Sequence, residues 1–135
     1  LETTHFVSND DTVKFYKINF VNKDSKKKKY KLTFWINQTF GPNEEKSSRY
    51  LLTDYYEKMN SVLIRNVYNI NFSHITAFMS STLPISDYSV NRILFKSIDV
   101  ELEIDGNSSK DFAFFAQIQE KICWARNFFS PFSTI

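Results

Sequence analysis

Four acidic residues alternate with four aliphatic residues in the last third of the chain. The aliphatic set is Ile98, Val100, Leu102 and Ile104, and the acidic set is Asp99, Glu101, Glu103 and Asp105. On a strand, alternate side chains lie on one face about 6.5–7 Å apart, so the four carboxylates would form a row. Such a row could bind a divalent cation or supply the acids of a nuclease.

A nuclease centre of this kind would also need a lysine two residues after an acid on the same strand. In this chain those positions hold another acid or Asn107, and Lys110 lies beyond the turn at residues 105–107. We therefore interpret the acidic row as the solvated face of an amphipathic strand that pairs with lysines of a neighbouring strand. No metal site is expected there.

Lysines are concentrated between residues 23 and 31, where six of the nine positions are Lys. Such a cluster could contact phosphates or anionic lipid head groups. Nucleic-acid sites usually combine this charge with aromatic residues and Arg, and only two aromatic residues lie nearby. A solvated hairpin tip is the preferred interpretation. The alternative is a site for single-stranded nucleic acid made by Lys26, Lys27, Lys28, Lys29, Tyr30 and Trp35.

Trp35 lies on the polar phase of an expected strand, between Thr33 and Asn37. If it faces outward, its ring could stack on a base or anchor a partner. If helices cover both faces of the sheet, the same ring is buried. The sequence leaves both placements open.

The segment from Ser108 to about Phe129 combines a capping signal with an apolar surface wider than one stripe. Ser108 and Asp111 have the spacing of a capping box, which predicts a helix. On a helical wheel, one contiguous stripe contains Phe114, Phe115, Ile118, Ile122, Ala125 and Phe129. A helix that is apolar on more than one side is central in its fold or contacts a partner. We predict a partner-binding surface from residues outside that stripe and in the tail: Phe112, Trp124, Phe128 and Phe132.

The other residues offer few catalytic options. His5 and His74 have no His or Cys at metal-ligand spacing, and Cys123 has no base nearby in the sequence. The chain has no nucleophile-elbow, phosphate-loop or dinucleotide-binding motif. We predict that the chain is not an enzyme, has no catalytic residues and needs neither a metal nor another cofactor.

Length and composition fit one domain over residues 1–135, with 42% hydrophobic and 17% aromatic residues available for a core. A net charge of +2 is too mild to indicate nucleic acid by itself. The abundance of Lys, Asn, Ile and Phe is typical of an AT-rich genome. Three glycosylation-type sequons, at Asn37, Asn71 and Asn107, are interpreted as coincidences in an intracellular protein. No apolar run reaches the roughly 20 residues that span a bilayer, so we expect no transmembrane segment.

Hydrophobic periodicity predicts the elements and their order. The expected strands cover residues 13–21, 30–40, 68–79 and 92–105. The first two are expected to form a hairpin with a basic tip, and the third contains a phase slip typical of a β-bulge. A one-sided apolar stripe predicts a helix from Ser47 to about Asn66. Residues 80–89 are expected to be a loop, and residues 1–12 either a frayed end or a short first strand.

The predicted fold class is therefore α+β, with the order (β)ββαββα. We expect an antiparallel sheet of four to five strands with two amphipathic helices packed on it. The element order also resembles that of an OB-fold with a C-terminal helix, as in oligonucleotide-binding domains and subunits of replication complexes. The expected function is a protein–protein or assembly module, with a protein partner or self-association through the C-terminal helix. Single-stranded nucleic-acid binding is the alternative that the OB-fold resemblance implies.

Overall fold

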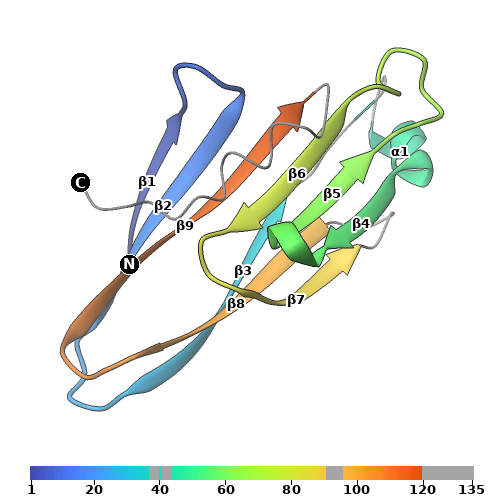
Figure 1. The fold of residues 1–135 in the computed structure, drawn as a ribbon. Helices are drawn as coiled ribbons and strands as arrows, with labels where there is room; N and C mark the ends of the chain where they lie inside the picture. The colour runs from blue at the N-terminus through green and yellow to red at the C-terminus, as the bar shows by residue number, and fades with distance from the viewer. Residues whose placement is uncertain (37–39, 41–43, 91–95, 120–135) are drawn as a thin grey trace.

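Strands dominate the part of the chain that the computed structural model describes, which comprises residues 1–36, 40, 44–90 and 96–119 (Figure 1). The strands are β1 (Glu2–Val7), β2 (Val13–Asn22), β3 (Lys28–Ile36), β4 (Leu52–Tyr56), β5 (Ser61–Arg65), β6 (Thr76–Ser81), β7 (Ile85–Val90), β8 (Lys96–Ile104) and β9 (Ser108–Gln119). Three short helical turns accompany them: α1 (Glu44–Ser47), η1 (Ser48–Tyr50) and η2 (Glu57–Met59). Among the described residues, no helix has the length and apolar content that crossing a membrane requires.

The strands form two antiparallel sheets. One sheet has six strands in the order β1-β2-β9-β6-β5-β4, and the other has three in the order β3-β8-β7. Both the predicted α+β class and the OB-fold alternative are therefore wrong. The described chain is mostly β, and its core lies between two separate sheets instead of between a sheet and helices.

One long two-stranded ribbon connects the sheets. β2 pairs with β9 up to the residue pair Asn22–Ser108, and β3 pairs with β8 from the residue pair Lys28–Ile104 onward. Both strands of the ribbon therefore bend between these two residue pairs, and the ribbon passes from one sheet to the other (Figure 1). We call this bend the corner and define it as residues 22–28 together with residues 103–108. Its geometry places the lysine cluster beside the acidic strand.

The main core lies between the sheets and is made by alternate residues of facing strands. β8 contributes Ile98, Val100, Leu102 and Ile104, all at most 3% exposed, as the sequence alternation predicted. From the six-stranded sheet come Ile18, Val62, Ile64, Ala77, Met79, Phe112 and Phe114. At roughly 25 cal/mol per Å² of apolar surface removed from water, this cluster is the chief source of stability.

A second apolar cluster lies on the opposite face of the six-stranded sheet. It consists of Val13, Leu63, Phe78 and Phe115, with Phe15 packed against it. Each of these residues is an odd number of positions from the main-core residues of its own strand, so its side chain lies on the opposite face. Leu63, for example, lies between Val62 and Ile64. The middle strands of this sheet are thus apolar on both faces.

That two-sided burial explains why the predicted helix over residues 47–66 is wrong. The segment folds as η1, β4, η2 and β5. Val62, Leu63 and Ile64 are buried in succession because β5 has an apolar cluster on each face. Consecutive apolar residues fill a helical stripe as readily as they fill a fully buried strand, and the periodicity alone does not separate the two.

The predicted C-terminal helix is wrong for the same reason over the residues that the structure describes. Residues 108–119 form β9, the third strand of the six-stranded sheet. Phe112 and Phe114 point into the main core, whereas Phe115 belongs to the second cluster. Residues 120–129 of the predicted helix lie outside the described residues.

The predicted strands are partly correct. β2, β3 and β8 are confirmed close to their predicted positions, and β1 shows that the start of the chain is a true strand. The predicted hairpin is wrong, because β2 and β3 belong to different sheets. The third predicted strand is correct only at its end, in β6, since residues 66–75 form a loop in place of the expected bulge. The expected loop over residues 80–89 contains β7.

Candidate functional site

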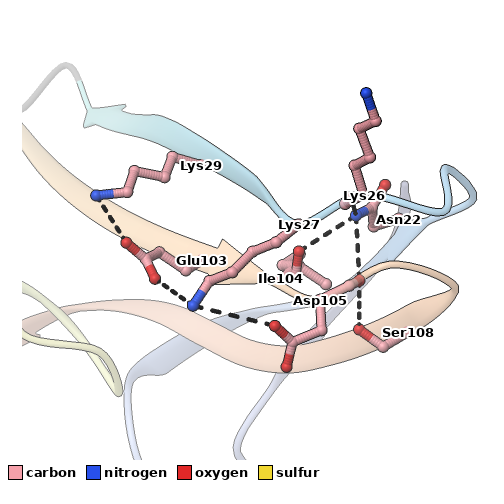
Figure 2. Close-up of polar contacts among 8 residues, drawn as sticks. All are labelled: Asn22, Lys26, Lys27, Lys29, Glu103, Ile104, Asp105 and Ser108. Atoms are coloured by element: carbon pink, nitrogen blue, oxygen red, sulfur yellow. Dashed lines mark hydrogen bonds and ion pairs between the residues drawn. The ribbon is translucent and has the colours of Figure 1, made fainter.

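The corner is held by one buried side-chain amide. Asn22 is 2% exposed, and its Nδ2 lies within hydrogen-bonding distance of three carbonyl oxygens: Lys26 at 2.9 Å, Asp105 at 3.1 Å and Ile104 at 3.2 Å (Figure 2). Its Oδ1 accepts a hydrogen bond from the Asp24 backbone N–H at 3.1 Å. An amide has two N–H groups, so the three carbonyls share them. Asn22 thereby ties both bends of the ribbon together.

The opposite bend approaches residues 24 and 25 closely. A Cβ atom at Gly106 would overlap the Ser25 carbonyl group, so only glycine fits this position. Next to it, Asn107 has a φ of 54° and donates its backbone N–H to the Asp24 carbonyl at 2.8 Å. The Ser108 hydroxyl donates to the Asp105 carbonyl at 2.7 Å (Figure 2). The backbone at the corner is therefore fixed from both sides.

On this frame, lysines of the loop and of β3 meet the acids of β8. Glu103 accepts from Lys27 Nζ at 2.6 Å and from Lys29 Nζ at 2.8 Å, one lysine on each carboxylate oxygen (Figure 2). Lys27 also lies 4.0 Å from Asp105, and Lys28 pairs with Asp24. The hydrogen bonds from Lys27 and Lys29 lower the pKa of Glu103 to about 2. In turn, the hydrogen bonds with the Glu103 carboxylate raise the pKa of both lysines.

A second ion pair continues the row along the same face. Lys31 Nζ lies 2.9 Å from Asp99 Oδ2 and 3.9 Å from Asp87, which is opposite Asp99 on β7. Partial burial favours the neutral form of Asp99, but the Thr33 hydroxyl and the Lys31 ammonium outweigh it and lower the pKa of this carboxyl. The predicted pairing of the acidic row with lysines of a neighbouring strand is thus confirmed. Among the described residues, no group of three or more His, Cys, Asp or Glu is arranged to hold a metal ion.

The residues of the predicted nucleic-acid site do not form one basic surface. Lys27, Lys28 and Lys29 are each paired with a carboxylate, whereas the Lys26 side chain extends away from Glu103 (Figure 2). Tyr30 points to the other face of β3 and packs on Phe20, with ring centroids 4.4 Å apart.

Trp35 is surface-exposed, at 60%, which answers the question that the sequence left open. It is six residues from Lys29 along the same strand, a separation of about 20 Å. The structure therefore separates the aromatic and basic parts of the predicted site.

Of the predicted partner-binding residues, the structure describes only Phe112. This side chain is 4% exposed and packs edge-on against Phe114, with ring centroids 5.7 Å apart. It is therefore a core residue of β9 and is not displayed on a helix. Trp124, Phe128 and Phe132 lie outside the described residues.

Sequence reasoning missed a second feature, the loop between β5 and β6. We call residues 66–75 the amide loop, because the side-chain amides of Asn66 and Asn69 organise it. Tyr68, Ile70 and Val67 are exposed on it, and Tyr50 of η1 lies beside Tyr68. The repeated asparagines were a usable signal, since their side chains cap turns and so favour a loop over a strand.

Comparison with known proteins relates this fold to carbohydrate-active enzymes. A family model described as "Glycosyl hydrolase 94, supersandwich domain" matches residues 1–102. A solved structure from the human microbiome, assigned as a kojibiose phosphorylase, superimposes with a TM-score of 0.57 at 14% sequence identity. The alignment covers 93% of this chain and 17% of the other chain. No curated protein matches the sequence.

Proposed function

This chain belongs to the glycosyl hydrolase 94 supersandwich domain family, and on that premise we propose that it is a non-catalytic β-sandwich domain of a larger enzyme that acts on glycosidic bonds. The family match overturns the expected generic binding module with its helical partner surface, and also the nucleic-acid alternative. The prediction that the chain is not an enzyme now applies to this domain alone and not to the protein that contains it. The family is enzymatic, and the proposal concerns which part of the enzyme this domain represents.

The state of the acidic row is the observation that carries the proposal. Glycoside hydrolysis generally uses two carboxyl groups, one of which keeps its proton through a raised pKa and protonates the leaving group. Two carboxyl groups of the row, those of Glu103 and Asp99, have the opposite property, a lowered pKa. Lysines lower the pKa of Glu103 to about 2 and help to lower the pKa of Asp99. These carboxylates are ionised partners of lysines, which suits a structural role and does not suit a general acid.

The extent of the structural match supports the same proposal. The chain spans about one sixth of the length of the matched phosphorylase, since 17% of that chain is covered. In a protein of that size, most of the polypeptide is available for a separate catalytic domain. A β-sandwich held by a large core and a fixed corner is a suitable rigid support for such a domain.

Two measurements test the proposal. The coding sequence around this chain should continue in frame into a region of several hundred codons, and stop codons directly on both sides would refute membership in a larger enzyme. The 135-residue chain should release no product from aryl glycosides or glucose disaccharides, with or without inorganic phosphate. Turnover that persists through purification and is abolished by Glu101→Gln or Glu103→Gln would show that the domain itself is catalytic.

A further inference from the structure

Apolar and aromatic side chains gather at the end of the sandwich where β5 leads into β6. Tyr68 is 70% exposed, Ile70 92%, Tyr50 50% and Val67 43%. The rings of Tyr50 and Tyr68 have centroids 5.9 Å apart and planes inclined by 54°. The amide loop projects beyond the strand ends beside α1 (Figure 1). Two adjacent tyrosine rings are thus presented to solvent on one loop and the helical turn next to it.

The loop that carries these side chains is fixed to the core. Asn66, 2% exposed, donates its Nδ2 to the Phe40 carbonyl at 2.8 Å and accepts the Tyr68 backbone N–H at 3.2 Å. Asn69 accepts the backbone N–H of Asn71 through its side chain and that of Phe72 through its carbonyl, both at 3.0 Å. Phe72 packs on Phe40. A loop fixed in this way loses little conformational entropy when a ligand binds.

The chemistry of the loop matches a neutral, hydroxyl-rich ligand. Residues 66–75 contain no Asp, Glu, Lys or Arg, in a chain that is 24% charged. Arg65, immediately before the loop, is paired with Asp54 at 2.7 Å. Asn71, Ser73 and His74 are exposed and offer amide, hydroxyl and imidazole groups for hydrogen bonds. The tyrosines add flat apolar faces with a polar tip.

Sugars combine these requirements, because a pyranose ring has an apolar C–H face and a rim of hydroxyl groups. A protein partner is a poorer fit, since a standard interface buries about 800 Å² per partner from roughly 20–30 residues, and this surface is one loop with one adjoining residue. Resting on the proposed function, we propose that the amide loop and Tyr50 form a binding site for a neutral oligosaccharide, whose rings stack on Tyr68 and Tyr50.

The test is a calorimetric and NMR titration of the 135-residue chain with maltotetraose, cellotetraose and laminaritetraose, which separate the possible linkages. At least one should bind and shift the amide signals of residues 66–75. Tyr68→Ala and Tyr50→Ala should each weaken binding about tenfold, because a stacked ring is lost. Tyr68→Phe, which keeps the ring, should bind nearly as the parent does.

Tyr56→Ala is the matched control, since Tyr56 is 42% exposed on β4 and outside the loop. It should leave affinity unchanged, and thermal melts should show that all variants are folded. The proposal is overturned if none of the three sugars binds, or if Tyr56→Ala weakens binding as much as Tyr68→Ala. Either result leaves the proposed function standing if the coding sequence continues into a catalytic region. Exposure of the loop would then be explained by contact with the rest of the enzyme.

Discussion

The Asn22 amide holds the corner, so replacing it with alanine should weaken the whole sandwich. The change removes two N–H donors that serve three carbonyl oxygens and one oxygen that accepts from Asp24. A buried hydrogen bond contributes about 0.5–1.5 kcal/mol net, and each polar group left without a partner adds a penalty. We expect the free energy of unfolding to fall by about 2–4 kcal/mol. For a chain of this length that lowers Tm by about 8–15 °C.

Urea and thermal denaturation of the parent chain and the variant measure this loss. Asn19→Ala is the matched control on the same strand, since Asn19 makes one solvent-exposed hydrogen bond, to Asp111 at 2.6 Å. It should cost less than about 1 kcal/mol. A loss below about 1 kcal/mol for Asn22→Ala, or equal losses in the two variants, would refute the conclusion that this amide fixes the corner.

Asn22→Asp adds a dependence on pH to the same test. The variant places a carboxylate against three carbonyl oxygens, which disfavours its ionised form and raises its pKa in the folded state. A raised folded-state pKa means that stability is retained at low pH and lost as the pH rises through that pKa. The difference in free energy of unfolding between the variant and the parent chain should therefore be smaller at pH 4 than at pH 8. An equal difference at both pH values would contradict the hydrogen-bond geometry assigned to residue 22.

Three further predictions concern other parts of the structure. Because the pKa of Glu103 is lowered to about 2 from 4.5, its contribution to stability is present above about pH 4.5 and lost as the pH falls toward 2. Urea midpoints of the parent should thus drop more over this interval than those of Glu103→Gln, and an identical drop would contradict the ion pairs. Gly106→Ala should lower the urea midpoint strongly, since its Cβ overlaps backbone, and an unchanged midpoint would show that the corner relaxes. Phe112→Ala should cost about 3–5 kcal/mol in the same assay, whereas a surface residue would cost almost nothing.

The sequence by itself determined the elements that have one solvent-exposed face and one buried face. The alternation at residues 98–105 correctly placed Ile98 and its aliphatic partners in the core. It also correctly predicted that the acidic row pairs with lysines of a neighbouring strand, without identifying that strand or the pairs. β2 was also predicted, from its β-branched and aromatic residues, and the first strand was one of two interpretations of residues 1–12. Along the second half of β8 burial alternates with exposure, and a period of two residues is a local property that the sequence displays.

Only the tertiary structure decided the segments that are covered on both sides. β5 and β9 lie inside the six-stranded sheet, where Leu63 and Phe115 face a second apolar cluster, so the period of two disappears and a helix is predicted instead. The amide loop was predicted wrongly for a different reason: Tyr68 and Ile70 alternate with asparagines as in a strand, although both side chains are exposed.

The corner depended on tertiary structure in a further way. Asn22 and Ile104 are 82 positions apart in the sequence, and only the folding of the ribbon brings them into hydrogen-bonding contact. The lysines were recognisable as a cluster, but their neutralisation by Glu103 required knowing that β3 pairs with β8. Periodicity reports how each residue is buried relative to its neighbours in the chain. It carries no information about which strands pair or what covers the second face, and here those two choices turn an apparent α+β protein into a β-sandwich.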